Sequence, residues 1–462
     1  MAQNESNDEI GESSISIAEK DIESDDPKLI QKGVFSLANL MNNMDGFLSE
    51  SLSDSTIPIL CKITTIDIDF HTRNIVMEFI AELCKTDKAA THKIFQISYY
   101  DFLLEILAKN RTSFPLMPVV EILSSIVNWT RFSFQTLMSK GYFDLLLQKL
   151  ANPELTVADQ YGVLRGILSV LKSTYFNDPN LFIHLIGTIS NYLIATEFKE
   201  ATLKISYNII GTAIGKLEDK QQLDFDLHPF FASSLQLLAN VGHPKIRLSI
   251  VSFLCNSVFH FDDVGNFLIQ NGLLDIFHNL WPSAPDKLKA ECLRTCSNCT
   301  FSSSECNGFL SSTVFLDDAF GCLINEQTQM DTKAEALALF QRLLTTDSKF
   351  FVREHGLTIL GRYPIFFDVL SNFLHLYKST MNQVNAQLIY MSLKCFYFAI
   401  VIYGNDVIPN GELPNAVKTL LNDENFMCLQ DLAEYNERSI QEIAQLLHKT
   451  VSEIAKSYFA NR

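Results

Sequence analysis

Hydrophobic and polar residues follow a helical spacing in this chain, and the same pattern returns about every 43 residues. With Asn298 as the reference, the equivalent positions are Asn39, Glu82, Ser125, Ser169, Thr212, Asn256 and Arg342. Consecutive gaps, with Asn298 in its place, are 43, 43, 44, 43, 44, 42 and 44 residues. A constant period in the forties is typical of stacked two- or three-helix repeats.

Two rows of positions are apolar in nearly every copy. Five residues before the reference position stand Val34, Met77, Val120, Leu164, Tyr207, Val251, Leu293 and Leu337. Two residues before it stand Leu37, Ile80, Leu123, Ile167, Ile210, Leu254, Cys296 and Phe340. Residues three apart share a helix face, so these rows predict one buried face on the last helix of each repeat.

A third row, four residues before the reference position, is mostly polar. It consists of Phe35, Glu78, Glu121, Arg165, Asn208, Ser252, Arg294 and Ala338. Together with the reference row it predicts a solvent-exposed face on the same helices.

Shorter apolar helices precede several of these long ones. We expect them at residues 100–109, 143–152, 274–280 and 315–324. Gly141 and Gly272 each stand three residues before an Asp of such a helix. Glycine there suits a tight turn with positive φ.

This order of a short helix ending in Gly, a second apolar helix, a turn and a long third helix resembles the armadillo repeat family. The resemblance covers residues 28–450. It implies an all-α fold, an armadillo-type α-solenoid, with about nine to ten repeats of ~43 residues in a right-handed superhelix.

Five segments are predicted along the chain. Residues 1–26 form a disordered acidic tail, and 27–46 an N-terminal capping helix that Asp25, Asp26 and Pro27 begin. Regular repeats occupy 47–345, a longer repeat with an insertion at 346–364 occupies 346–410, and 411–462 form a C-terminal capping repeat. The insertion is either a binding loop or, as loops more commonly are, a plain surface excursion.

Composition and charge limit the classes of partner that the chain is expected to bind. The net charge is −17, of which residues 1–27 carry −8 from nine acids and Lys20, which leaves −9 for the rest. An acidic chain with no basic block suits nucleic acid poorly. No apolar run reaches about 18 uncharged residues, so no membrane span is expected. The ten Cys form no paired framework, and we expect a monomeric cytoplasmic protein, with the nucleus as the alternative location.

Two patterns could carry chemistry. Cys292, Cys296, Cys299 and Cys306 include a CxxC spacing typical of zinc ligands, but Cys296 lies in an apolar row, which favours packed free thiols. The acid pairs at 262–263 and 317–318 are interpreted as helix N-terminal caps. No phosphate loop or catalytic motif occurs, so we expect neither an enzyme nor a cofactor.

The resemblance places the third helices on the concave side, where their polar rows form a ladder along a groove. The predicted protein-binding residues are Asn39, Glu78, Glu82, Glu121, Arg165, Asn208, Asn256, Arg294, Asn298 and Arg342. The signs predict a groove that is acidic toward the N-terminal end and basic toward the C-terminal end. The expected function is a scaffold that binds an extended protein segment or a folded partner.

The alternative is a divergent nuclear transport adaptor. The chain resembles the importin-alpha family in length and in number of copies, and in that family a ladder of Trp four residues before Asn holds a basic peptide. Here Asn recurs at Asn39, Asn256 and Asn298, preceded at that distance by Phe35, Ser252 and Arg294. The family's opening basic arm is replaced by the acidic tail.

Overall fold

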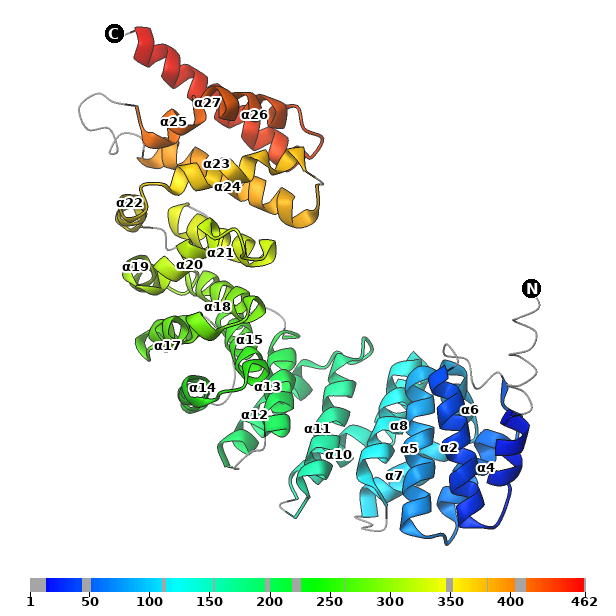
Figure 1. Ribbon diagram of the computed structural model, residues 1–462. Coiled ribbons are helices and arrows are strands. Elements are labelled where there is room, and N and C mark those ends of the chain that lie inside the picture. The colour runs from blue at the N-terminus through cyan, green and yellow to red at the C-terminus, as the bar shows by residue number, and fades with distance from the viewer. Residues whose placement is uncertain are drawn as a thin grey trace, which may run out of the picture. The chain divides into compact units, whose positions relative to one another are not determined.

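The computed structural model describes residues 14–43, 51–109, 114–152, 154–195, 200–217, 226–261, 263–345, 352–379, 381–403 and 413–460. Within these ranges the regular structure is entirely helical. The chain divides into two compact units: unit 1 comprises residues 1–181 and 195–213, and unit 2 comprises 182–194 and 214–462. We describe each unit by itself (Figure 1).

After a short helix at residues 14–22, unit 1 contains α2 (Pro27–Asn43), α4 (Thr56–Thr65) and α5 (Phe70–Thr86). Two full three-helix repeats follow, as a list of first, second and third helices: α6 (Lys88–Gln96), α7 (Tyr99–Lys109) and α8 (Leu116–Trp129), then α9 (Arg131–Ser139), α10 (Tyr142–Leu150) and α11 (Val157–Lys172). The third helices α2, α5, α8 and α11 pack side by side in that order (Figure 1). Helix α13 (Glu200–Ile214) falls almost wholly in this unit.

Unit 2 contains α12 (Pro179–Ala195), α14 (His228–Asn240) and α15 (Pro244–His260), followed by four three-helix repeats. These are α16 (Val264–Gln270), α17 (Leu273–Leu280) and α18 (Asp286–Cys299); α19 (Ser304–Ser312), α20 (Phe315–Ile324) and α21 (Met330–Leu344); α22 (Arg353–Arg362), α23 (Phe366–Leu374) and α24 (Gln383–Tyr403); and α25 (Asn415–Leu420), α26 (Asp423–Ala433) and α27 (Arg438–Ala460). Short 3-10 turns follow α17 at Trp281–Ser283 and α23 at His375–Lys378.

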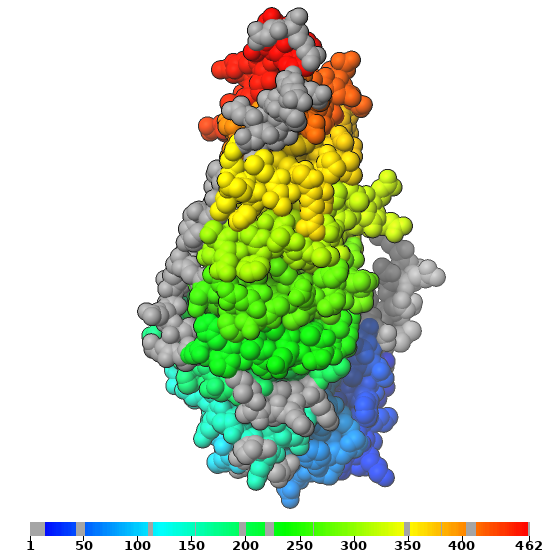
Figure 2. Space-filling model, turned by 90° about the vertical axis from the view of Figure 1, so that its left-hand side faces the viewer, coloured from blue at the N-terminus to red at the C-terminus, as the bar shows by residue number. Residues whose placement is uncertain are grey.

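Within unit 2, α15, α18, α21 and α24 stack one on the next, and α16, α19 and α22 also pack in that order. Figure 1 shows α19 and α22 on the side of this unit opposite α18 and α21. In the space-filling view the repeats of this unit follow one another as successive bands from green to orange (Figure 2). Hydrogen bonds also connect successive repeats: the Asp286 side chain, at the start of α18, accepts from the Gln329 N–H, directly before α21, at 3.2 Å.

The two apolar rows form the core. All sixteen residues of these rows, from Val34 to Phe340, are at most 2% exposed. None of the eight residues of the polar row is buried, and Phe35 is 54% exposed. The sequence prediction of one buried and one exposed face on each third helix is therefore confirmed.

The predicted turns are also confirmed. Gly141 and Gly272 have φ values of 80° and 88°, and each directly precedes a second helix. Ser98 takes the same place before α7 with φ of 57°, in a conformation that a side chain normally disfavours.

The prediction of a disordered tail is wrong for residues 14–22, which form a helix; residues 1–13 lie outside the described part. Ile15, Ala18 and Ile22 are at most 4% exposed, because their spacing puts them on one helix face against α2. Glu19 accepts a hydrogen bond from the Ser53 N–H at 2.7 Å, and Asp21 pairs with Lys32 at 2.8 Å. Helix α2 therefore does not end the stack alone.

The insertion predicted at 346–364 has a different structure in its described part, since residues 346–351 lie outside it. Helix α22 packs on α19 as the first helix of a repeat rather than as a separate excursion. The acid pairs lie at helix N-termini as interpreted, but without capping bonds. Asp262 is not described, and Asp263 occupies the N-cap position of α16 with no side-chain capping bond. Asp317 and Asp318 stand in the first turn of α20, and their side chains bond to Tyr363 at 2.7 Å and to His278 at 2.6 Å.

Among the described helices, residues 383–402 are long and apolar enough to cross a membrane on length and composition, although Lys394 interrupts the stretch. In this structure 56% of the apolar window is buried, because α24 packs on α21, α23 and α27. A core helix of a soluble protein meets the same criterion.

Asp69 caps α5 and gives a first prediction. Its carboxylate accepts from the Thr72 N–H at 3.0 Å and from the Thr72 hydroxyl at 2.6 Å, and these hydrogen bonds lower the Asp69 pKa. Replacing an N-cap Asp with Ala costs about 1 kcal/mol, so Asp69→Ala is expected to lower the free energy of unfolding by that amount at pH 7. Urea unfolding followed by Trp129 emission measures it.

The effect has a defined pH dependence. A folded-state pKa below the unfolded value stabilises the fold above the unfolded pKa, about 3.9 for Asp, and this stabilisation is lost as the pH falls through the folded pKa. The difference between wild type and Asp69→Ala should therefore shrink below about pH 4. Asp67→Ala, two residues earlier and exposed, is the control with little effect. A difference that stays constant down to pH 3 would contradict the capping role.

Candidate functional site

The exposed sides of the third helices form a surface in each unit, which we call the third-helix face. It carries the polar row, the reference row and, one turn further on, the residues three positions after the reference row. Residues at these three positions lie four and three apart, so they share one stripe of each helix. All ten predicted binding residues lie on this face, and none of them is buried.

In unit 1 the face is linked across repeats by ion pairs. Glu121 of α8 pairs with Arg165 of α11 at 2.6 Å and with Lys85 of α5 at 2.9 Å. Lys85 also pairs with Glu82 at 3.0 Å. Partial burial lowers the pKa of Lys85, but the hydrogen bonds to Glu121 and Glu82 outweigh it and leave the pKa above its ordinary value. The chain Glu82–Lys85–Glu121–Arg165 thus spans three third helices.

A cavity of about 370 Å³ opens on this part of the face. Its lining comes from α5, α6, α8 and α11 and includes Lys85, Lys88, Thr91, Glu121, Ser124, Ser125, Asn128, Trp129, Arg165 and Ser169. The Trp129 indole stacks on His92 with ring centroids 4.7 Å apart. The Asn128 amide nitrogen donates to Ser169 Oγ at 2.7 Å and to the Ser124 carbonyl at 2.9 Å.

Glu78 is the remaining acid of the predicted ladder in unit 1. It is exposed and accepts a hydrogen bond from Asn74 at 2.8 Å, one turn earlier on α5. Glu78 and Glu82 both stand on α5, but Glu82 pairs with Lys85, and the cavity that Lys85 lines has three cations and one carboxylate in its lining.

In unit 2 the predicted basic character is not what the structure shows around Arg294. The Arg294 guanidinium pairs with Glu335 of α21 at 2.6 Å and with Glu291 of its own helix at 3.0 Å. Two carboxylates against one guanidinium make this place net negative. The sequence prediction counted Arg294 but not its partners, which lie on other rows.

Asn298 and Arg342 form a second connection in unit 2. The Asn298 side chain donates from Nδ2 to the Cys255 carbonyl oxygen at 3.3 Å, and its Oδ1 accepts from the Arg342 guanidinium at 3.2 Å. The Arg342 guanidinium also lies over the Phe301 ring, 4.6 Å from its centroid. Phe259 stands on the same face and is 63% exposed.

The three remaining predicted residues, all asparagines, lie apart from the ion pairs and the cavity described above. Asn39 is exposed on α2, Asn208 is half-buried on α13, and Asn256 is half-buried on α15. Asn39 and Asn208 fall in unit 1 and Asn256 in unit 2, and none of them lines the cavity.

Sequence reasoning missed the row three residues after the reference position. It contributes Lys85, Asn128, Phe259 and Phe301, which supply the cavity and the exposed aromatic rings. Continuing the same register by one turn would have found them. Trp129 and Lys88 carry no such signal, because they come from the junctions between helices.

The cysteines show no sign of a metal centre in the described residues. Cys292, Cys296, Cys299 and Cys306 are all buried, and no group of three or more His, Cys, Asp or Glu side chains there could hold a metal ion. Burial raises the pKa of the Cys296 and Cys299 thiols well above the ordinary value, as expected for thiols packed in an apolar core.

Comparison with known proteins defines the class. No protein-family description and no curated protein matches the sequence. An engineered protein gives a TM-score of 0.69 at 12% identity, covering 95% of this chain and 99% of its own. A chain from a structure of the phosphorylation switch between cadherin and beta-catenin gives 0.54 at 12%, covering 96% and 94%. SYS-1 gives 0.53 at 12%, covering 95% and 91%.

Beta-catenin and SYS-1 are armadillo-repeat proteins. This chain therefore has an armadillo-type fold, an all-α solenoid, as the sequence predicted. At 12% identity the likeness extends to the fold alone.

Proposed function

We propose that this protein is a non-enzymatic scaffold that binds an extended segment of a partner protein along its third-helix face. One observation carries the proposal. Polar side chains join successive third helices within each unit, through Glu121 between Lys85 and Arg165 in unit 1 and through Asn298 and Arg342 in unit 2.

Such a face repeats its donors and acceptors at the spacing of the helices, about 8–10 Å in packed helix pairs. An extended peptide advances about 3.3 Å per residue, so every third residue meets a new repeat. The fold neighbours agree with this proposal, since one of them concerns an interaction between cadherin and beta-catenin. Single exposed charges contribute little each, so affinity depends on several repeats acting together.

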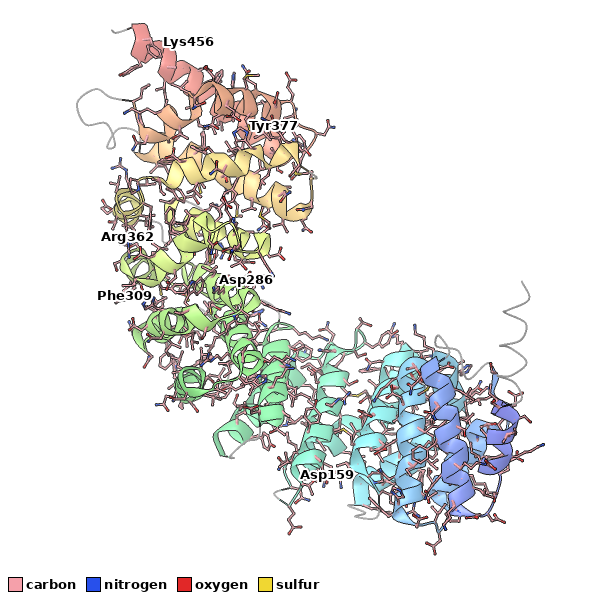
Figure 3. All side chains as sticks on the ribbon, viewed as in Figure 1. Asp159, Asp286, Phe309, Arg362, Tyr377 and Lys456 are labelled. Carbon is pink, nitrogen blue, oxygen red and sulfur yellow. The ribbon has the colours of Figure 1, made fainter. Side chains whose placement is uncertain are left out.

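Site-specific photo-crosslinking tests the proposal. A benzophenone side chain in place of Phe259, on α15, or of Phe301, in the turn directly after α18, is expected to crosslink neighbouring residues of one partner segment. Phe309 is the matched control, because it is 45% exposed but belongs to α19, on the opposite side of unit 2 (Figure 3). Mass spectrometry of the crosslinked peptides identifies both the partner and its order along the face.

The outcomes separate the alternatives. Crosslinks from Phe259 and Phe301 to adjacent residues of one segment support an extended occupant. Crosslinks from Phe309 alone would place the partner on the first helices and reject the proposal. The transport-adaptor alternative rests on length, number of repeat copies and the recurrence of Asn, and a nuclear import receptor among the crosslinked partners would support it.

A further inference from the structure

The cavity on unit 1 has a charge opposite to that of the chain as a whole. Its lining holds the cations Lys85, Lys88 and Arg165 and the single carboxylate Glu121, in a protein whose net charge is −17. From this contrast we propose that the cavity is an anchor for an acidic segment of a partner protein, with an aspartate or glutamate side chain bound among the three cations. This inference rests on the proposed function and names the chemistry of its ligand.

The cations are held in place before any ligand arrives. Glu121 lies between Lys85 and Arg165, and its side chain is only 14% exposed. Its two oxygens each bind one of them, at 2.9 and 2.6 Å. Glu121 therefore orients both cations. Glu82, outside the lining, also pairs with Lys85 at 3.0 Å, which leaves Lys88 as the lining cation without an ion pair among the described residues. Preorganised donors favour binding because the ligand does not have to order them.

Lys88 supplies the available positive charge. It is the first residue of α6, it is exposed, and within the described part of the chain its ammonium makes no ion pair or hydrogen bond. The N-terminal end of α6 adds its helix dipole at the same place, although Asp87 caps it. A carboxylate in the cavity would gain Lys88 as a full partner.

The rest of the lining suits a peptide rather than a lone anion. The Asn128 amide nitrogen is already committed to Ser124 and Ser169, while Asn128 Oδ1 accepts no hydrogen bond from the described residues, so it can accept from a peptide N–H. Trp129, held by its stack on His92, provides an apolar wall. A cavity of about 370 Å³ accommodates one side chain with its backbone.

Trp129 also provides the readout, because the chain has only two tryptophans. In a Trp281→Phe background, emission comes from the cavity alone. A synthetic peptide of alternating serine and glutamate is the probe, and the same peptide with glutamine in place of glutamate is the neutral control. We expect a saturable emission change with the glutamate peptide, weakened by added salt, and none with the glutamine peptide.

A matched pair of variants locates the binding. Lys88→Glu should weaken binding of the glutamate peptide by about tenfold or more, since an attractive charge contact becomes a repulsive one. Lys20→Glu makes the same charge change on an exposed residue of unit 1 outside the cavity and should stay within about twofold. Position 88 is exposed and begins a helix, where Glu is favoured, so folding is preserved.

Four results would overturn the proposal: no binding of the glutamate peptide, equal binding of the glutamine peptide, equal losses in both variants, or equal binding of a single-stranded oligonucleotide. Binding of a phosphoserine peptide alone would replace the carboxylate by phosphate and reject the stated class. If crosslinks at Phe259 and Phe301 are obtained while these tests fail, the third-helix face remains the binding surface and only the acidic anchor is rejected.

Discussion

Replacing Phe340 with alanine is expected to lower the free energy of unfolding of unit 2 by about 3–5 kcal/mol, the usual cost of deleting a fully buried phenyl ring. Phe340 is 0% exposed and lies 5.4 Å from the Phe366 ring and 5.5 Å from the Tyr363 ring, measured between ring centroids. It therefore joins α21 to the following repeat. The void left by removal of the phenyl ring cannot close unless α21 and α23 move toward each other.

The measurement is urea unfolding followed by Trp281 emission in a Trp129→Phe background, because Trp281 belongs to unit 2. In a repeat array each repeat is stabilised mainly by its immediate neighbours. Trp129 belongs to unit 1, several repeats before Phe340 in the sequence, so its emission should report a smaller loss of stability. Phe309→Ala is the control: the same substitution at a residue 45% exposed should cost less than about 1 kcal/mol. A loss below about 1 kcal/mol for Phe340→Ala would mean that the ring does not join the repeats.

Phe340 also marks what the sequence could predict. Its row was identified from spacing alone, because a residue that must be buried at the same place in every repeat leaves a periodic signal. The same holds for Gly141 and Gly272, whose positive φ follows from their place before a second helix. Features that repeat are therefore readable from one sequence.

The charge pattern of the face was less predictable. Glu335 is 41 residues from Arg294 and lies on a different row, so no scan of a single row includes both. Lys85 likewise meets Glu121 from the next repeat and changes the character of the acidic end. Ion pairs between repeats depend on the conformations that long, flexible side chains adopt, and the sequence does not specify these conformations.

The division into two units was not foreseen either. Residues 47–345 were predicted as one regular array, whereas the division falls within it, around residues 182–213. Residues 173–178 form no helix, so α12 follows without a short first helix, and α12 spans 17 residues where α10 spans 9. The constant spacing of the third helices concealed this change. That spacing stays the same whether the residues between two third helices form two short helices or one long one.

The N-terminal helix was missed because composition was given more weight than spacing. Nine acids in the first 27 residues indicated a solvated tail, yet Ile15, Ala18 and Ile22 form an apolar stripe at helical spacing. That stripe contacts α2 where Gly33 allows the two helices to approach closely. A Cβ atom at Gly33 would lie 2.6 Å from the Ala18 carbonyl oxygen and 2.8 Å from Ile22 Cγ1.

Gly33→Ala is therefore expected to displace the helix at 14–22 and to destabilise unit 1 by about 1–3 kcal/mol, the range for overpacking. The obstacle at Ala18 is backbone, so a change of side-chain rotamer cannot relieve it. Hydrogen exchange should show lost amide protection at residues 14–22, with α5 and α8 still protected. Lys20 should become an early site of trypsin cleavage.

Gly321→Ala is the matched control, because Gly321 lies within α20 and a Cβ there would meet nothing within 4 Å. The same substitution should stabilise unit 2 by about 0.5–1 kcal/mol, since alanine favours a helix interior over glycine. Opposite signs for one substitution at two helical glycines can arise only from what surrounds each Cβ. If Gly33→Ala also stabilises, and residues 14–22 lack amide protection in the wild type as well, the helix is not held against α2. The α2 surface that Ile15, Ala18 and Ile22 cover would then be open to a partner.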